Sequence, residues 1–446
     1  MISSLSRPEF CGCMNKQIKV CLWLIFVLRS SLALGITDEE IFRNFQFSFV
    51  NPGARASAMG NAFIALADDA TAAEANPAGL TILTKPEVSF EYRNIRFDAQ
   101  HLNSLNEVSV PLQETTITTS NDLQTLNRPS FWSFVYPRHG TTFAVSMQEA
   151  VRLQGNIDED FHLLLIDQST GQHHDLQFAA IGNTDQKVVN WNFSVARKIT
   201  DRLSIGLTLR LSTLDWQAGV DNSYFDGGIK LPFTQTAIDD SDHAFAWNAG
   251  AIYRIGSNMF LGAVYKRNAR FQVTEVESGS QSLKPGPFRN VLKIPDIFGT
   301  GFAIRPNDSI VLSSDLVRIQ YSDLMEAFQA GRNVVTFDLT NEDIHYGIED
   351  GWEFHFGSEF IVLLKNLPIA MRQGYYRKKS NSLFLVSAPG VSPSDLAIYE
   401  AIFKKGEDEN HLTLGAGVVF TNFQVDCAFD ASKSTTHFVL STVVRF

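Results

Sequence analysis

The stretch NPGARASAMGNAFIALADDATAAEANPAGL, from Asn51 to Leu80, decides the fold. It is rich in Gly and Ala, and an Asn-Pro pair stands near each end. The residue before a proline avoids the helical region, so each pair predicts a turn. The run between the pairs, Met59 to Ala75, has helical composition. Because small side chains fit a confined space, we interpret the stretch as a plug; a helix-turn of a soluble domain is the alternative.

From Glu87 onward the apolar residues recur with a period of two, which is typical of strands. In LSIGLTLRLS (203–212), four leucines and an isoleucine alternate with small and polar residues. The run VVNWNFSVA (188–196) alternates in the same way. Lipid against one face explains such an unbroken apolar row, so the pattern predicts a membrane-spanning barrel rather than a soluble sandwich.

The connections between these runs fall into two classes. We expect strands at about 87–98, 129–137, 141–151, 188–199, 202–216, 244–255, 259–271, 296–305, 309–319, 351–363, 367–378, 411–421, 423–430 and 436–446. Alternate joins are very short, whereas most of the others have about 18 to 36 residues, including 152–187 and 217–243. Outer-membrane barrels have short periplasmic turns and long extracellular loops. The sequence therefore predicts an all-β membrane protein, a 14-stranded antiparallel barrel plugged by a small N-terminal helical hatch.

The N-terminus has the features of a secretory signal peptide. Lys16 and Lys19 precede an apolar run from Val20 to Leu28, and small residues precede a cleavage point after Ala33. The apolar run is too short to span a membrane. Met14 is an alternative start, and a retained membrane anchor is the other interpretation. We divide the chain into a signal peptide (1–33), a hatch (34–86) and a barrel (87–446).

Composition and motifs exclude several classes of function. A net charge of −11 argues against nucleic acid as a partner. The sequence lacks the GxSxG, HExxH, P-loop and dinucleotide motifs, so we expect no enzyme and no cofactor. Asp68, Asp69 and Glu74 lack the spacing of a metal-binding loop, and we expect capping or lumen ion pairs there instead of a metal site.

The hatch stretch resembles the FadL-type family of outer-membrane transporters of long-chain fatty acids and other hydrophobic compounds. The matching residues are Gly53-Ala54-Arg55-Ala56, Met59-Gly60, Ala62-Phe63, Ala65, Ala67-Asp68-Asp69-Ala70 and Asn76-Pro77-Ala78-Gly79-Leu80. The resemblance implies a multi-pass protein of the Gram-negative outer membrane with 14 strands. Together with the first Asn-Pro pair, these residues lead us to assign the hatch and channel site to Asn51, Pro52, Gly53, Asn76, Pro77, Ala78 and Gly79. Some relatives in this family serve as shuttles of a secretion system.

Charged residues fall at lumen-facing positions of the predicted strands. They include Arg210, Asp315, Glu353, His355, Glu359, Arg372, Asp426 and Arg445. Charges inside a barrel must pair or meet water. We interpret them as a mutually neutralising network that holds the plug; binding of a substrate carboxylate by one arginine, such as Arg372, is the alternative.

Passive, diffusional uptake of hydrophobic molecules, most simply long-chain fatty acids, is the function that the resemblance implies. The alternative is a non-transporting barrel that acts as a secretion shuttle or anchors surface proteins. In the family, the hatch and a kink in the third strand shape the ligand's exit. The third strand here, TTFAVSMQEAVRLQ (141–154), has no Gly or Pro to encode a kink. Expected partners are an apolar ligand, outer-membrane lipids and the barrel-assembly machinery, whose insertion signal the last strand resembles, ending as it does in Phe446.

Overall fold

The structure, a computed structural model, describes residues 49–97, 108–110, 115–123, 125–166, 173–226, 229–279, 286–326, 345–365, 367–390, 396, 400 and 404–446. The predicted signal peptide, 1–33, and residues 34–48 of the predicted hatch lie outside this part of the chain. Across the described ranges, no helix combines the length and the apolar character needed to cross a membrane.

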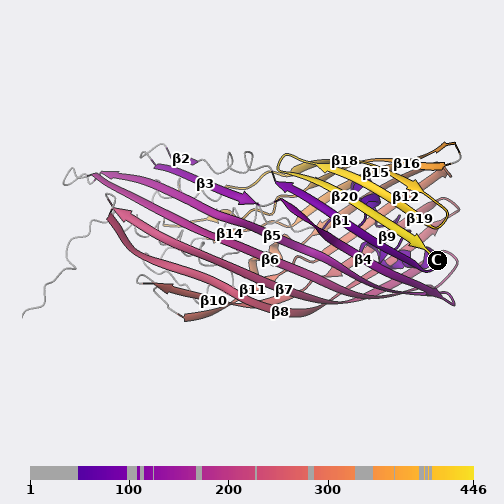
Figure 1. The fold of residues 1–446 in the computed structure, drawn as a ribbon, viewed down its shortest axis with the longest axis horizontal. Coiled ribbons are helices and arrows are strands. Elements are labelled where there is room, and N and C mark those ends of the chain that lie inside the picture. Colours follow the sequence, from indigo (N-terminus) through magenta and orange to yellow (C-terminus); the bar gives the residue numbers. More distant parts are fainter. Residues whose placement is uncertain are drawn as a thin grey trace, which may run out of the picture.

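Fourteen antiparallel strands pair in a closed ring, which is the predicted barrel (Figure 1). Their bounds are β1 (Glu87–Phe97), β4 (Leu126–Arg138), β5 (Thr141–Ile166), β6 (His173–Lys198), β7 (Leu203–Asp226), β8 (Ile229–Ile255), β9 (Met259–Arg267), β12 (Ile297–Asn307), β13 (Ile310–Ile319), β15 (Gly351–Leu364), β16 (Leu367–Lys378), β18 (Glu409–Val419), β19 (Phe423–Ala431) and β20 (Thr435–Arg445). The first strand pairs with the last, from Glu87 opposite Arg445 to Phe97 opposite Thr435. Closure lets the backbone satisfy its hydrogen bonds without water.

Short turns gather at the end of the barrel where the C-terminus lies (Figure 1). The turn between β4 and β5 consists of His139 and Gly140, and both have positive φ, 49° and 76°. Such a two-residue turn matches the right-handed twist of the strands that it joins. The predicted short turns are therefore present at this end, but the predicted difference in length does not hold throughout, because only residues 227–228 separate β7 from β8 at the other end.

Strands β5 to β8 are much longer than the sequence predicted, with 26, 26, 24 and 27 residues. A membrane requires about 9–11 residues per strand. The expected long loops at 152–187 and 217–243 are wrong, because most of these residues continue the strands beyond the barrel (Figure 1). Outside the membrane neither face meets lipid, so the polar sequence there lacks the apolar alternation by which the strands were recognised.

The structure contains further strands besides the fourteen of the barrel. They are β2 (Val108–Val110), β3 (Thr115–Leu123), β10 (Arg270–Gly279) and β11 (Gly286–Lys293), while β14 (His345–Gly347) and β17 (Phe384–Ser387) form a separate pair. The strand expected at 259–271 is thus split into β9 and β10. At the break, the backbone N–H of Asn268 donates to Asp296 Oδ1 at 2.8 Å instead of to a neighbouring strand.

The outer face of the barrel confirms the predicted alternation. On β6, Phe193 is 58% exposed while the adjacent Asn192 is fully buried. On β7, Leu209 is 59% exposed and Arg210 is 3% exposed. Apolar side chains thus point outward toward lipid, and polar side chains point into the lumen.

The third barrel strand, β5, contains an irregularity that the sequence did not predict. Its register against β6 shifts between Glu149 and Val151. Its pairing with β4 stops at Gln148, and its pairing with β3 begins at Gly155. Between these two positions β5 has no strand partner on that side among the described residues. A bulge needs only one extra residue, so the absence of Gly and Pro did not exclude it.

Residues 49–83 lie inside the barrel, toward the end with the short turns (Figure 1). They form α3 (Ala54–Ala58), α4 (Ala72–Ala75) and η1 (Pro77–Ile82). The helix expected over 59–75 is therefore wrong except for its last turn. Gly60 and Asn61 have positive φ, and the N–H groups of Phe63 and Ile64 donate to the barrel residue Asp315 (2.7 and 2.9 Å). Contacts with the wall thus replace the hydrogen bonds of a helix.

Candidate functional site

Glycines of the barrel wall make room for the hatch. A Cβ atom added at any of them would lie less than 3.0 Å from hatch atoms; they are Gly206, Gly250, Gly262, Gly299, Gly301, Gly357, Gly374 and Gly415. They belong to β7, β8, β9, β12, β15, β16 and β18. The hatch backbone therefore packs directly on the wall around much of the ring, an approach that only glycine allows. Our sequence analysis missed this feature, whose signal is glycine at lumen-facing strand positions.

The second Asn-Pro pair joins the end of the hatch to the wall. Asn76 is fully buried, and its Nδ2 donates to the carbonyls of Ile64 (2.8 Å) and of Ala251 on β8 (3.3 Å). Its Oδ1 accepts from the N–H of Ala78 at 3.2 Å. Pro77 is the first residue of η1, where a missing N–H has no consequence. The predicted turn is thus present, and it also bridges hatch and barrel.

The first Asn-Pro pair lies at the other end of the hatch. Asn51 donates from Nδ2 to the carbonyl of Asn61 at 3.2 Å. Gly53 has a φ of 97°, which favours glycine, and its N–H donates to Glu91 on β1. The remaining predicted hatch residues, Pro52, Ala78 and Gly79, are all buried.

A network of buried charges ties the hatch to the wall. Arg55 of α3 binds both carboxylate oxygens of Glu359 on β15 (2.9 and 3.0 Å) and also pairs with Asp68. Arg372 on β16 binds Glu359 at 2.6 Å and Asp426 on β19 at 2.7 Å. The side chain of Arg372 is 1% exposed, and both of these carboxylates bind it. This geometry favours the neutralising network over the alternative that Arg372 binds a substrate carboxylate.

The other predicted lumen residues also line the hatch or its surroundings. His355 Nδ1 lies 2.9 Å from the carbonyl oxygen of Gly60. Glu353 accepts from the hydroxyl of Tyr321 at 3.3 Å. At the foot of the barrel, Arg445 pairs with Glu87 at 2.9 Å.

The three hatch carboxylates considered for a metal have separate partners. Asp68 pairs with Arg55, and Asp69 accepts from the backbone N–H of Thr71 at 2.9 Å. Glu74 pairs with Arg210 at 2.7 Å and with Lys266 at 3.1 Å. Burial alone would raise the pKa of Glu74, but the two cations outweigh burial and hold the pKa below its usual value. In the structure, ion pairs occupy Asp68 and Glu74, and a local hydrogen bond from Thr71 occupies Asp69.

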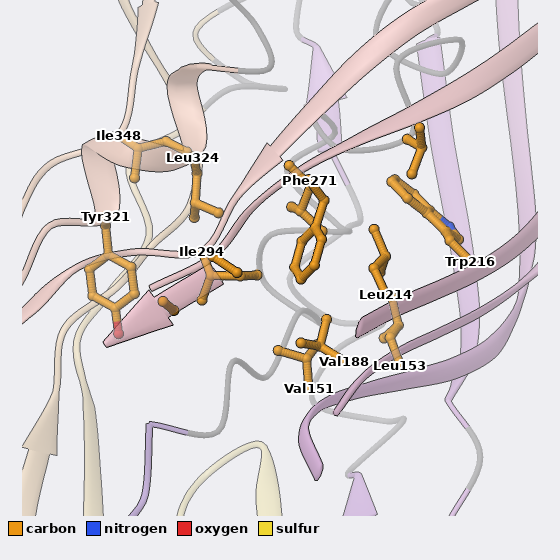
Figure 2. Close-up of a cluster of buried hydrophobic side chains, with 14 of the residues drawn as sticks. Val151, Leu153, Val188, Leu214, Trp216, Phe271, Ile294, Tyr321, Leu324 and Ile348 are labelled. Atoms are coloured by element: carbon orange, nitrogen blue, oxygen red, sulfur yellow. The ribbon is translucent and has the colours of Figure 1, made fainter. Parts of the chain in front are cut away.

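A cluster of buried apolar side chains lies beyond the hatch (Figure 2). Figure 2 shows Leu153, Val188, Leu214 and Trp216 gathered near Phe271. The same cluster includes Val151, Ile294, Ile297, Ile319, Tyr321 and Leu324 of η2 (Tyr321–Leu324), Ile348 and Leu383. The cluster comes mainly from the extended strands, from β10 and from the segment after β13, so it lies on the side of the hatch opposite the short turns.

Two cavities lie where the hatch approaches this cluster. The larger, about 60 Å³, is lined by Ile64 of the hatch and by Ile297 and Tyr321 of the cluster. The smaller, about 30 Å³, is lined by Ala150 beside the β5 bulge. Lys266 lines both cavities. The cationic side chains along the larger cavity are Arg128, Arg152, Lys266 and Lys378.

One wall of the larger cavity is polar and was largely missed from the sequence. Its side chains are Glu353, His355, Tyr376, Lys378, His411 and His437. The ring of Tyr376 stacks between the rings of His355 and His411, with centroids 5.2 and 4.2 Å apart. Asp430 accepts from the Tyr376 hydroxyl at 2.7 Å and lies 2.8 Å from His411 Nδ1. These residues stand at lumen-facing positions of neighbouring strands, and this alternation is the sequence pattern that could have revealed them.

We next compared the sequence and the structure with known protein families and solved structures. Residues 44–381 match the model of a family described as outer membrane protein transport protein (OMPP1/FadL/TodX). The chain belongs to this family. No curated protein matches the sequence significantly.

Solved structures of OMPP1/FadL/TodX-like proteins share the fold at low sequence identity. A FadL homologue from Pseudomonas aeruginosa is 13% identical with a TM-score of 0.59, over 89% of this chain and 99% of that one. The Ralstonia pickettii toluene transporter TbuX is 14% identical with a TM-score of 0.56, over 90% and 100%. The monoaromatic hydrocarbon channel CymD is 13% identical with a TM-score of 0.55, over 90% of this chain and 99% of that one.

Membership in the OMPP1/FadL/TodX family confirms the resemblance first seen in the hatch stretch. It also confirms the predicted location: the chain is a multi-pass barrel of the Gram-negative outer membrane and an outer-membrane transport protein.

Proposed function

We propose that the protein carries hydrophobic molecules across the outer membrane by diffusion, with long-chain fatty acids as its leading substrate class. In this proposal it is a channel and not an enzyme. The observation that carries the proposal is the apolar cluster around Trp216 directly beyond a hatch that fills the lumen. Transfer of an apolar ligand from water into contact with such apolar side chains lowers its free energy.

The cations of the larger cavity favour a ligand with a carboxylate. Toluene and other monoaromatic hydrocarbons, named for TbuX and CymD, have no charged group to offer these side chains. A fatty acid has both an apolar chain for the cluster and an anion for Lys266 or its neighbours. Outer-membrane lipids and the barrel-assembly machinery are the other partners that we propose.

The irregular β5 strand supports a route sideways out of the barrel. The smaller cavity reaches Ala150 at the bulge, where the ladder between β4 and β5 has already ended at Gln148. A ligand that passes the hatch there would meet the membrane instead of the periplasm. We therefore place the exit in this proposal between β4 and β5.

Trp216 provides a direct test, because it is 2% exposed and lies in the apolar cluster. Long-chain fatty acids brominated along the chain are expected to quench its fluorescence saturably in the purified protein. Replacing Trp216 with Phe should remove that part of the quenching, while the unbrominated acid should compete with it. If the quenching is identical in the wild type and in W216F, the ligand does not enter this cluster. The shuttle or anchor function would then be favoured.

A further inference from the structure

A row of exposed apolar side chains crosses the outer face of the barrel from β4 to β7, close to the short turns. It consists of Tyr136, Phe143, Val195 and Leu207, each paired with the next across the sheet. A tyrosine in such a row is typical of the interface between the hydrocarbon core of a membrane and the lipid head groups. The row therefore marks the edge of the hydrocarbon region at the end with the short turns, which is the periplasmic end.

The next row toward the short turns contains two arginines. Arg138 on β4 is opposite Thr141 on β5, and Thr141 is opposite Arg197 on β6. Both arginines are exposed, and they continue the outward-facing alternation of Tyr136 and Val195. Two strand spacings separate them, about 10 Å. Both guanidinium groups can therefore reach one ligand in front of Thr141.

The positive charge of this region is not compensated within the protein. Among the residues that the structure describes, neither guanidinium has an ion-pair or hydrogen-bond partner. Residues 138–141 and 197–204 contain four lysines and arginines but one carboxylate, that of Asp201, whereas the whole chain has a net charge of −11. Neighbouring like charges repel one another, so an anion that binds between them lowers the electrostatic energy.

We propose that Arg138, Arg197 and the Thr141 hydroxyl bind the phosphate of an anionic phospholipid in the periplasmic leaflet. Guanidinium groups bind phosphate oxygens through pairs of parallel hydrogen bonds. The acyl chains of the same lipid lie against the adjacent apolar row, which a soluble phosphate would leave unused. The surplus of cations disfavours a head group with an ammonium of its own and favours one with a net negative charge.

This proposal rests on the proposed partnership with outer-membrane lipids, and it names the lipid class and the side chains that bind it. It does not depend on which molecule the barrel transports. The site lies on the outer face, away from the hatch, at the turn that joins β4 to β5.

Native mass spectrometry of the purified full-length protein measures the binding. The probes are phosphatidylglycerol and phosphatidylethanolamine with identical acyl chains, and the wild type is expected to prefer phosphatidylglycerol. Arg138→Gln and Arg197→Gln should each lower this preference about fivefold, the usual effect of one cation near an anionic lipid surface, and the double variant about twenty-five-fold. Heat-modifiable migration on gels verifies that each variant folds.

Two further variants separate a phosphate site from a general effect of charge. Replacing both arginines with lysine keeps the charge but removes the paired hydrogen bonds, so only part of the preference should remain. Lys405→Gln is the matched control, because this 51% exposed lysine lies at the other end of the barrel and pairs with Glu349. It should leave the preference unchanged.

Equal affinity of the wild type for the two lipids, or an unchanged preference in the double glutamine variant or the double lysine variant, would overturn the proposal. Competition by glycerol phosphate would also overturn it, because a soluble anion without acyl chains would then suffice. Failure of the proposed partnership with lipids looks different, since the wild type would then retain neither lipid. Failure of fatty-acid uptake would leave all of these affinities unchanged.

Discussion

Removing residues 51–83 is expected to turn the closed barrel into an open pore. These residues pack against wall glycines on seven strands, and without them the lumen would be lined at that level by polar side chains such as Glu359 and Arg372. A barrel with a polar interior and no plug fills with water. Conductance in planar bilayers should rise about tenfold or more, as expected for a water-filled channel.

The variant must first be shown to insert, by heat-modifiable migration of the purified protein. A suitable control is Gly219→Ala, since a Cβ there would meet only Asn183 Oδ1 at 4.0 Å. The control should conduct like wild type. An inserted but non-conducting deletion variant would mean that the apolar cluster around Trp216, and not the hatch, closes the barrel.

Replacing Arg372 with Met is expected to be the most destabilising single change in the lumen network. Arg372 binds Glu359 at 2.6 Å and Asp426 at 2.7 Å, and all three side chains are almost fully buried. Loss of one partner from a buried ion pair costs about 3–5 kcal/mol. Here Asp426 would stay buried without its cation, while Glu359 would keep Arg55. Urea unfolding of the protein in liposomes measures this loss.

Arg318→Met is the matched control for that experiment. Arg318 is 46% exposed and pairs with Asp350 at 3.0 Å near the surface. An exposed pair contributes about 1 kcal/mol or less. Equal losses in the two variants would contradict the view that the lumen charges are desolvated and hold the hatch.

The barrel could be predicted because lipid imposes a rule on the sequence. Every second residue of a spanning strand must be apolar, so Phe193 and Leu209 mark the outer face directly. The rule does not apply to the parts of a strand that extend beyond the membrane surface. The sequence of the long extensions of β5 to β8 therefore predicted loops. In the structure these residues remain in the sheet, and β6 and β7 pair along their length without a register shift.

The hatch was recognised, but its internal structure was not. Alanine-rich composition favoured a helix over 59–75, whereas Asp315 and the wall glycines select a different backbone path. Such contacts link residues about 250 positions apart, as between Phe63 and Asp315 (252 residues), and local propensity cannot report them. Arg210 was expected to face the lumen, but nothing in the sequence paired it with Glu74 and Lys266.

Uptake of radiolabelled oleate by cells tests most directly whether this hatch-filled barrel admits fatty acids. The protein would be produced in a Gram-negative host that lacks its own fatty-acid transporter, and its insertion would be verified in the outer membrane. We expect saturable oleate uptake well above that of the host alone, and lower uptake in Lys266→Met. Oleate uptake no higher than in the host alone, with the barrel inserted, would contradict fatty-acid transport and favour a secretion shuttle or an anchor for surface proteins.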